Sequence, residues 1–263
     1  MINIQDHTGK LIYLPSPPQR IISLVPSQTE LLYDLGLNER VVGITKFCVH
    51  PQQWFNTKKR IGGTKNINID IVKSLDPDLI IANKEENTKE QIELLEKLCP
   101  VFTTNVFDLS SAMRMIQDIG IITQTNKAAD ILSASINEKF NALSIDQSLR
   151  ALYLIWKNPY MAAGGDTFIS DMMKYAGLVN CIASKQRYPE FSVQDIIDLN
   201  PDIILLSSEP YPFTEIHINE IRSFLPTACI ILVNGEYFSW YGSRLRFTPS
   251  YLKELQNISL ANI

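Results

Sequence analysis

The 263-residue sequence lacks the short motifs that mark many enzyme active sites. It contains no G-x-S-x-G nucleophile motif and no G-x-x-x-x-G-K-[ST] phosphate loop. Its three histidines, His7, His50 and His217, share no metal-ligand spacing, and its four cysteines form no C-x-x-C pair. His7 and His217 are expected to be solvated, in a turn and in a polar loop. These absences predict a binding protein with no catalytic residue, no catalytic cofactor and no metal site.

Charge and hydrophobicity exclude two further classes of protein. The net charge is −4, and Lys58-Lys59-Arg60 is the one basic triplet, which argues against a nucleic-acid partner. No run of about 18 apolar residues is present, so membrane insertion is not expected. The first ten residues lack the charged and apolar regions of a secretory signal, so the chain as written is expected to be leaderless and cytoplasmic. We expect a monomer.

What the sequence does contain is one local pattern that occurs twice. Residues 69–82 and 193–206 align at a constant offset of 124 (201 − 77), which matches Pro77-Asp78 with Pro201-Asp202. Each copy predicts a short helix, a turn at the Pro-Asp pair, and a buried parallel strand. A capping residue precedes each helix, and these two residues are Asn68 and Ser192. The repeat therefore predicts two similar lobes, with a ligand bound in a cleft between them.

The remaining periodicity extends this plan along the chain. Strands are predicted at 20–25, 41–44, 79–82, 101–103, 152–156, 203–206 and 230–233, helices at 89–98, 110–119, 126–143, 218–224 and 249–258, and a hairpin at 2–14. Two further helices are expected to end at Gly36 and Gly177 in the left-handed conformation. The predicted fold class is α/β, with two Rossmann-like parallel-sheet lobes joined by one long helix. The expected boundaries are 1–125 for the N-terminal lobe, 126–147 for the connecting helix and 148–263 for the C-terminal lobe.

Aromatic residues follow many of the predicted strands, where α/β sheets bind their ligands. They predict a large, flat and partly apolar ligand that is held by stacking and burial. The aromatic residues in these loops are Phe47, Trp54, Tyr160, Tyr188, Phe191, Tyr211, Phe213, Tyr237, Phe238, Trp240 and Tyr241. Ser27 and Glu30 are expected to form a capping box that directs backbone N–H groups toward the same edge of the first sheet.

Several motifs together resemble a known family. They are residues 20–30, Gly43-Ile44-Thr45, Gly62-Gly63-Thr64, the repeated Pro-Asp unit and Asn158-Pro159-Tyr160. In this combination the chain resembles the substrate-binding proteins of ABC importers for cobalamin and iron complexes, most nearly the vitamin B12-binding branch. The resemblance spans about residues 10 to 258. It implies a class III periplasmic-binding-protein-like fold, cobalamin or a related corrinoid as the transported ligand, and an ABC permease dimer as partner. Such proteins are periplasmic or are surface lipoproteins.

The resemblance also implies roles for individual residues. Phe47 matches an aromatic residue that clamps the corrin, Tyr188 matches a stacking tryptophan, and Glu236 matches an acid that hydrogen-bonds the amide edge of the corrin. Thr64 and Asn83 fall where the family has tryptophans. Exposed acids at the starts of the two repeated helices would dock onto arginines of the permease; the corresponding residues are Asp70 in the first lobe, and Gln194 with the nearby Glu190 in the second.

Two alternatives stay open. A siderophore or haem would present anionic groups, for which Lys65 and Arg244 are candidate partners. A leaderless cytosolic enzyme that handles corrinoids or metals could use Cys48 and His50 as metal ligands, although a buried structural thiol is the favoured interpretation of Cys48. The full set of expected ligand-binding residues is Ser27, Phe47, Thr64, Lys65, Tyr160, Tyr188, Glu236, Tyr237, Trp240 and Arg244.

Overall fold

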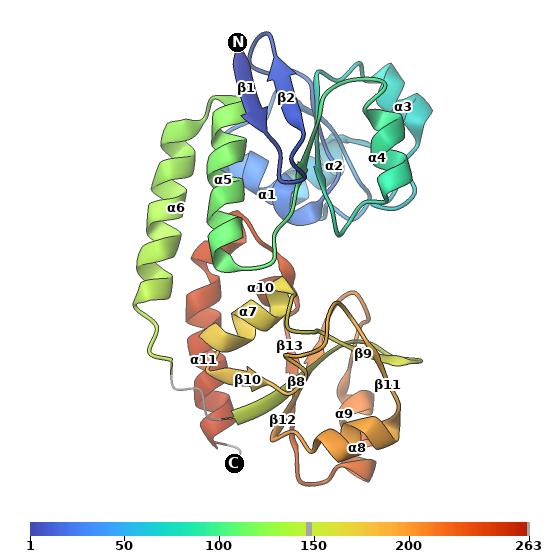
Figure 1. Ribbon diagram of the computed structural model, residues 1–263, viewed down its shortest axis with the longest axis vertical. Coiled ribbons are helices and arrows are strands. Elements are labelled where there is room, and N and C mark those ends of the chain that lie inside the picture. Colours follow the sequence, from blue (N-terminus) through green and yellow to red (C-terminus); the bar gives the residue numbers. More distant parts are fainter. Residues whose placement is uncertain (146–148, 262–263) are drawn as a thin grey trace. The chain divides into compact units, whose positions relative to one another are not determined.

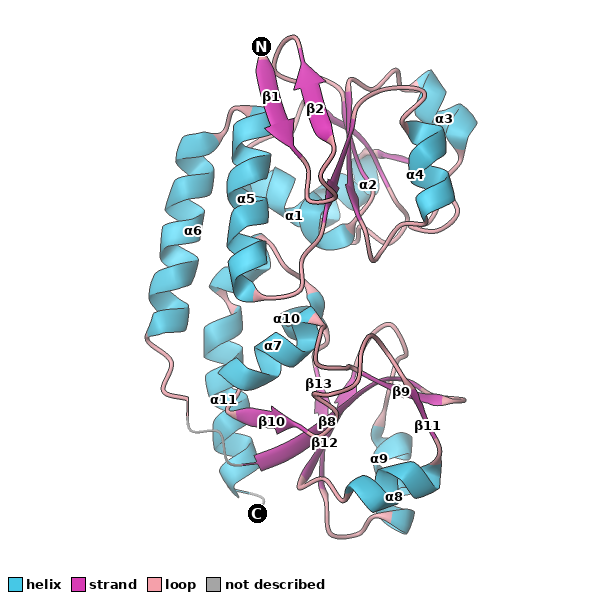
Figure 2. Ribbon diagram, viewed as in Figure 1, coloured by secondary structure: helices cyan, strands magenta, loops and turns pink. Residues whose placement is uncertain are grey.

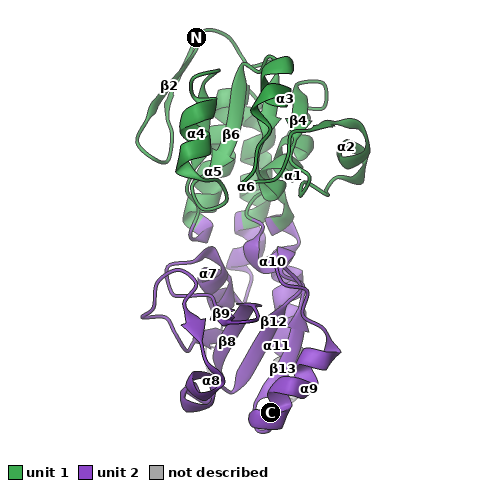
Figure 3. Ribbon diagram, turned by 90° about the vertical axis from the view of Figure 1, so that its right-hand side faces the viewer, with its two compact units in different colours: residues 1–106, 110–136, 241–244 green, residues 107–109, 137–240, 245–263 purple. Residues whose placement is uncertain are grey.

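The computed structural model describes residues 1–145 and 149–261, which divide into two compact units (Figure 3). Unit 1 comprises residues 1–106, 110–136 and 241–244, and unit 2 lies within residues 107–109, 137–240 and 245–263. The predicted lobe boundary between residues 147 and 148 lies outside the described residues, and the lobe boundaries as a set stay a prediction. Throughout the described ranges, every helix is too short or too polar to cross a lipid bilayer.

Unit 1 is built on a parallel five-stranded sheet (Figures 1 and 2). The strands, in spatial order, are β5 (Lys59–Arg60), β4 (Val41–Ile44), β3 (Ile21–Ser23), β6 (Leu79–Asn83) and β7 (Val101–Thr104). All residues of β3, β6 and β7 are buried, as expected for parallel strands with both faces covered. An antiparallel hairpin of β1 (Ile2–Gln5) and β2 (Leu11–Leu14) precedes the sheet, as predicted.

The helices of unit 1 approach their neighbours closely at two glycines. Its helices are α1 (Pro26–Asp34), α2 (Gln52–Thr57), α3 (Ile69–Ser74), α4 (Lys89–Leu95), α5 (Leu109–Thr123) and α6 (Asn126–Asn141). A Cβ atom on Gly43 of β4 would lie 2.8 Å from Leu75 Cδ1, so the residue that ends α3 packs closely over this glycine. A Cβ atom on Gly120 would lie 2.5 Å from Ala129 Cβ, which brings α5 and α6 side by side (Figure 1). The helix predicted at 126–143 is α6, and it contributes residues to both units.

Unit 2 contains a six-stranded sheet that is mixed instead of wholly parallel. Its main order is β11 (Glu190–Phe191), β9 (Tyr160–Ala162), β8 (Leu149–Trp156), β12 (Ile203–Ser207) and β13 (Cys229–Val233), and β10 (Leu178–Asn180) pairs with β8. Strand β9 runs antiparallel to β8 because a tight turn at Asn158, with φ of 64°, reverses the chain. The predicted α/β class is confirmed, whereas the prediction of a loop at Tyr160 is wrong.

The helices of unit 2 follow the predicted alternation with strands. They are α7 (Phe168–Tyr175), α8 (Val193–Leu199), α9 (Glu215–Phe224), α10 (Glu236–Ser239) and α11 (Thr248–Ala261), with a 3-10 turn at Ser243–Arg246. Buried apolar residues of β8, β12, α8 and α9 form one core cluster. Gly36 and Gly177, which follow α1 and α7, have φ of 80° and 73°, so the expected left-handed helix ends are confirmed.

The repeated Pro-Asp pattern corresponds to a repeated hydrogen-bond arrangement. In unit 1 the Asp78 carboxylate accepts the backbone N–H groups of Gln19 (2.6 Å) and Arg20 (2.9 Å), immediately before β3. In unit 2 the Asp202 carboxylate accepts the N–H of Arg150 (2.8 Å) near the start of β8. Each aspartate thereby fixes the strand that follows its helix beside the neighbouring strand of the same sheet.

The residue before each proline and one arginine complete the repeat. Asp76 and Asn200 both have φ of 43°, the left-handed conformation that short polar side chains tolerate. Arg20 donates from Nε to the carbonyl of Leu75 (2.9 Å), and Arg150 donates from Nη2 to the carbonyl of Leu199 (2.8 Å). These bonds satisfy carbonyls that the ends of α3 and α8 leave unpaired.

Local predictions at helix starts had mixed outcomes. The side chains of Asn68 and Ser192 accept hydrogen bonds from the first turns of α3 and α8, as expected. The capping box at Ser27 is wrong, because α1 begins one residue earlier, at Pro26 after Val25, and has no side-chain cap. A proline is well suited to this first helical position because it lacks an N–H group.

The prediction that His7 and His217 are solvated, in a turn and in a polar loop, is also wrong. The His7 side chain is 4% exposed, and its Nε2 lies 3.0 Å from Asp118 Oδ2. His217 lies in the first turn of α9, where its ring Nδ1 accepts the N–H of Thr214 (2.9 Å) and its Nε2 lies 3.2 Å from the Tyr211 hydroxyl. Both histidines therefore connect elements of their own unit.

Candidate functional site

In unit 1, three predicted residues lie together in the loops after β4 and β5. Phe47 is 50% exposed, and Lys46 Nζ lies 5.0 Å from the centroid of its ring. A Cβ atom on Gly63 would lie 3.2 Å from Phe47 Cε2, so the ring lies against the Gly63 backbone. Thr64, which is buried, and Lys65, which is exposed, follow directly. We define the unit 1 surface as the first turn of α1 after β3 (residues 26–28) together with the loops after β4 (45–48) and β5 (61–65).

A buried polar network holds the strand ends beside this surface. The hydroxyl of Thr104 accepts hydrogen bonds from Gln28 Nε2 and from Asn83 Nδ2 (3.0 Å) and donates to the carbonyl of Ala82 (3.0 Å). Asn87 Oδ1 accepts the Asn83 N–H (2.9 Å), and Asn87 Nδ2 donates to the Thr64 carbonyl (2.9 Å). Asn83, for which the resemblance implied a tryptophan position, is 1% exposed, so it supports the loop backbone from within the unit.

The charged pair Glu30–Arg244 also belongs to unit 1. Arg244 donates from Nε (2.9 Å) and Nη2 (2.7 Å) to the two carboxylate oxygens, and the side chains are only 13% and 16% exposed. Burial raises the pKa of Glu30 even though the Arg244 guanidinium acts in the opposite direction. The Glu30 carboxylate therefore neutralises the Arg244 guanidinium and occupies two of its five N–H donors, which weakens its attraction for an anionic ligand. Ser27 is buried close by, because a Cβ atom on Gly242 would lie 2.9 Å from the Ser27 carbonyl oxygen.

Cys48 and Trp54, which both lie between β4 and β5, have structural environments. The Cys48 thiol is fully buried, accepts the Thr29 hydroxyl (3.0 Å) and lies 3.2 Å from the Thr45 hydroxyl. Burial raises the pKa of this thiol, which favours its neutral form. Trp54 is 1% exposed and donates from Nε1 to Asn38 Oδ1 (2.8 Å). In the part of the chain that the structure describes, no three His, Cys, Asp or Glu side chains are grouped as metal ligands.

In unit 2, three predicted residues lie on or next to the short helix α10, which follows β13. Glu236 is its first residue, and its N–H donates to Asn234 Oδ1 (3.1 Å). The ring of Tyr237 stacks on Tyr251, with 4.4 Å between centroids and 18° between planes. Trp240, directly after α10, is only 6% exposed. We call α10 and the strand ends beside it, residues 207–209 and 234–240, the unit 2 surface.

Glu209, for which no role was predicted, belongs to the unit 2 surface and contacts the end of α10. Its Oε1 accepts hydrogen bonds from Ser239 Oγ (2.8 Å) and Trp240 Nε1 (2.9 Å). The sequence signal was an acid two residues after a buried strand, but nothing local indicates that this acid meets residues thirty positions later.

Tyr160 and Tyr188 are less accessible than expected. Tyr160 is 7% exposed on β9, packs in the unit 2 core and donates its hydroxyl to Glu220 Oε1 (2.9 Å), while Lys157 pairs with the same carboxylate. Burial and then Glu220 raise the pKa of Tyr160. Tyr188 is half-buried, with the Arg187 guanidinium 5.7 Å from its ring centroid. The structure does not place either ring on α10 or on the strand ends beside it.

Trp156 was predicted as the last residue of a strand, and the structure shows that its side chain is exposed. It ends β8, is 41% exposed, and its ring meets Tyr211 edge to face at 5.6 Å.

The three predicted docking residues lie on the surface of their units. Asp70 is in the first turn of α3, its side chain is 96% exposed, and Lys73 Nζ lies 4.0 Å away. Glu190, on β11, and Gln194, in the first turn of α8, are also exposed, and Gln194 donates to Asp198 Oδ1 (2.8 Å).

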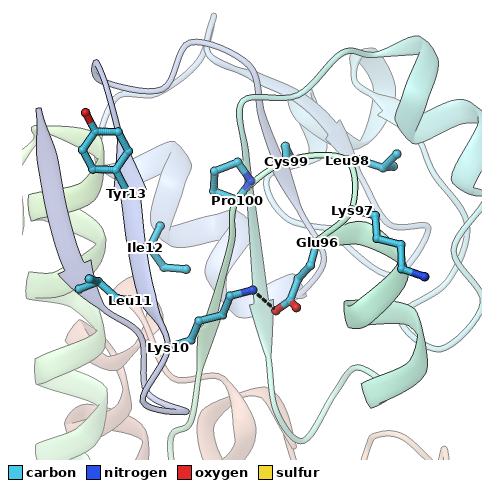
Figure 4. Close-up of a pocket in the computed structure, with 9 residues that line it drawn as sticks. All are labelled: Lys10, Leu11, Ile12, Tyr13, Glu96, Lys97, Leu98, Cys99 and Pro100. Carbon is cyan, nitrogen blue, oxygen red and sulfur yellow. Dashed lines mark ion pairs between the residues drawn. The ribbon is translucent and has the colours of Figure 1, made fainter.

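A separate hollow of about 300 Å³ opens at the other end of the unit 1 sheet (Figure 4). It is lined by residues 10–13 of the hairpin and residues 96–100, which lead into the amino end of β7. Lys10 Nζ pairs with Glu96 across it at 2.8 Å. Because ligands of parallel α/β sheets bind beyond the carboxyl ends, this hollow is not the candidate site.

Comparison with known sequences gives a family match and several named relatives. The sequence model of a family described as periplasmic binding protein matches residues 21–223. An uncharacterised ABC transporter substrate-binding lipoprotein of Bacillus subtilis is 29% identical over 217 residues, covering 78% of this chain and 68% of the relative. The vitamin B12-binding protein of Vibrio cholerae is 26% identical over 206 residues, covering 76% and 74%.

Solved structures share the fold at lower identity. The periplasmic vitamin B12-binding protein of Vibrio cholerae superposes with a TM-score of 0.80 at 21% identity, covering 94% of this chain and 99% of that one. A periplasmic haem-binding protein in complex with two haems gives a TM-score of 0.81 at 20% identity, covering 92% and 98%.

Proposed function

The chain belongs to the periplasmic binding protein family, and from this membership we propose that it is the substrate-binding component of an ABC-type importer. The family match covers residues 21–223, which include most of both units. A relative named as an ABC transporter substrate-binding lipoprotein supports the same role. The family resemblance predicted from the sequence motifs is thereby confirmed, while the transport role is our proposal.

The transported ligand that we propose is cobalamin or a related corrinoid. The main observation in support is the half-exposed Phe47 ring, which lies on the Gly63 backbone and forms a flat apolar platform at the carboxyl end of the unit 1 sheet. In unit 2, Tyr237 offers a second aromatic ring, and the Glu236 carboxylate can accept hydrogen bonds from primary amides. A corrin presents both kinds of group, an apolar ring and an edge of amides. Relatives named as vitamin B12-binding proteins agree with this choice.

A ferric chelate or haem is the second candidate ligand. The exposed Lys65, one residue after Thr64 on the unit 1 surface, favours it because such ligands carry anionic groups. The ion pair of Arg244 with Glu30 counts against it, since the second cation predicted for that role already has a carboxylate partner.

An ABC permease is the proposed protein partner, with Asp70 and Glu190 as acidic docking residues. Both are exposed on the surfaces of their units, as a docking contact requires. Gln194 contributes a neutral amide at the start of α8. An enzymatic role through Cys48 is not proposed, because its thiol is buried and hydrogen-bonded to threonine hydroxyls.

Gel filtration of the purified protein with cyanocobalamin tests the ligand. We expect the corrin absorption to elute with the protein. Phe47→Ala should weaken this binding about tenfold or more, because it removes a well-packed aromatic contact with the ligand. Tyr13→Ala is the matched control, since Tyr13 is 49% exposed but lies on β2 beside the separate hollow. A colourless protein peak with cyanocobalamin, but a coloured one with haem or a ferric siderophore, would replace the corrinoid with the second candidate.

A further inference from the structure

We propose that Glu209 is the positioning residue of the unit 2 surface: its carboxylate fixes α10, and through α10 it fixes Glu236 and Tyr237 for the ligand. The ligand part of this inference rests on the proposed function. The positioning part depends on contacts within unit 2 alone.

Helix α10 cannot hold its own conformation. It consists of the four residues Glu236–Ser239, a single turn, and its N-cap Gly235 makes no side-chain capping bond. One turn of helix is unstable in isolation because few hydrogen bonds repay the ordering of the backbone. The orientation of Glu236 and Tyr237 must therefore come from tertiary contacts.

Glu209 supplies such a contact at the C-terminal end of α10. One carboxylate oxygen accepts from Ser239 Oγ at 2.8 Å and from Trp240 Nε1 at 2.9 Å. Ser239 is the last residue of α10, and Trp240 follows it at a 6% exposed position. Hydrogen bonds to a carboxylate are stronger than those between neutral groups, so this oxygen gives the turn a defined end.

Close packing holds Glu209 against the start of the same helix. A Cβ atom on Gly235 would lie 2.4 Å from Ser207 Oγ and 2.7 Å from Glu209 Cγ. The Gly235 N–H donates to Ser208 Oγ at 3.0 Å. The end of β12 and the loop after it therefore contact both the N-cap and the last residue of α10, and a glycine at 235 permits the approach.

Aromatic contacts support the middle of the turn. Tyr237 stacks on Tyr251, whose hydroxyl accepts the Asn234 N–H at 2.8 Å. Phe238 packs on Tyr153 at 4.9 Å, and the Tyr153 hydroxyl donates to Ser207 Oγ at 3.0 Å. These rings contact the middle of the turn, whereas the Glu209 carboxylate contacts its C-terminal end through Ser239 Oγ and Trp240 Nε1.

Amide hydrogen exchange of residues 237–240, followed by mass spectrometry, tests the positioning. Their N–H groups donate to the carbonyls of residues 234–236, so exchange reports on the turn itself. Removal of the anchoring carboxylate in Glu209→Ala should raise local exchange about tenfold or more, whereas Glu209→Gln, which keeps an acceptor oxygen, should stay close to the wild type. Trp240→Phe, which removes one donor, should give an intermediate increase.

Glu220→Ala is the matched control. Glu220 is another half-buried acid of unit 2, and it accepts from Tyr160 and pairs with Lys157. Its loss should lower stability without raising exchange at 237–240. Unchanged exchange in Glu209→Ala, or an equal rise in Glu220→Ala, would overturn the positioning role.

Calorimetric titration with cyanocobalamin tests the ligand part. Loss of preorganisation in Glu209→Ala should weaken binding about tenfold, with affinity restored in Glu209→Gln. Faster exchange with unchanged affinity would overturn the link between α10 and the ligand. If the wild-type protein binds neither cyanocobalamin, haem nor a ferric siderophore, the proposed function fails, and the exchange result alone decides whether Glu209 positions α10.

Discussion

Two aromatic residues seven positions apart, both between β4 and β5, have opposite environments. Phe47 is 50% exposed, whereas Trp54 is 1% exposed and donates its indole N–H to Asn38. We expect Trp54→Ala to lower the free energy of unfolding by about 3–5 kcal/mol, because it empties a core position. Phe47→Ala should change it by less than about 1 kcal/mol. Urea denaturation measures both values, and similar losses in the two variants would contradict the assignment of Phe47 to a ligand surface.

Glu30 gives a prediction about pH at the same scale. Burial raises the pKa of its carboxyl in the folded protein above the ordinary value of 4.5, and this outweighs the Arg244 guanidinium. Between the pKa of Glu30 in the unfolded chain and its higher pKa in the folded protein, the folded state binds more protons than the unfolded state. The contribution of Glu30 to stability therefore falls as pH rises through this interval. Glu30→Gln does not titrate. The wild-type free energy of unfolding minus that of the variant should therefore decrease as the pH rises above about 4.5, because the folded carboxyl loses its proton at a higher pH than the unfolded one. An increase, measured by urea denaturation across this range, would show that the ion pair dominates instead.

At the scale of elements, helix caps give a controlled comparison. The side chains of Asn68 and Ser192 accept N–H groups in the first turns of α3 and α8, whereas Thr88, the N-cap of α4, makes no such bond. Asn68→Ala and Ser192→Ala should each cost about 1 kcal/mol of stability because an N–H group loses its acceptor. Thr88→Ala should cost much less. A loss for Thr88→Ala equal to the other two would mean that helix propensity, not the capping bond, sets the cost.

The elements that could be predicted are those specified by local chemistry. The two Pro-Asp units were visible because one short segment contains the cap, the left-handed residue and the aspartate. Strand β9 was missed because Tyr160–Ala162 has three residues and no alternation, and its pairing with β8 depends on the turn at Asn158. The partners of His7 and His217 were missed for a related reason, because both contacts form only in the folded chain. Asp118 is 111 positions from His7, and Tyr211 meets His217 only once the first turn of α9 has formed.

For the whole molecule, the sequence indicated which strand ends to search but not which side chains there are accessible. Phe47 and Lys65 are exposed as expected, while Tyr160 and Trp240 are buried. Burial of these two depends on hydrogen-bond partners far along the chain, Glu220 for Tyr160 and Glu209 for Trp240. A loop aromatic residue and a core aromatic residue have the same local sequence signal, so only the fold separates them.

The division into two units allows a test of whether both bind the ligand. Trp54 lies in unit 1, whereas Trp156 and Trp240 lie in unit 2, so variants that keep tryptophan in one unit report on that unit alone. Trp156→Phe with Trp240→Phe leaves the probe in unit 1, and Trp54→Phe leaves the probes in unit 2. Ligand at 100 times its dissociation constant should stabilise each unit that binds it by about 2.7 kcal/mol, because only the folded form binds.

We expect the urea unfolding transitions seen by both probe sets to move to higher urea when cyanocobalamin is added. The dissociation constant is measured first for each tryptophan variant, so that all are compared at the same saturation. The matched control is the urea titration of each variant without ligand. The shift is measured against that titration, so the stability lost through the Trp54 substitution does not enter it. A shift confined to the unit 1 probe would assign the ligand to the Phe47 surface alone and would remove Glu236 and Tyr237 from the site. A shift confined to unit 2 would do the reverse.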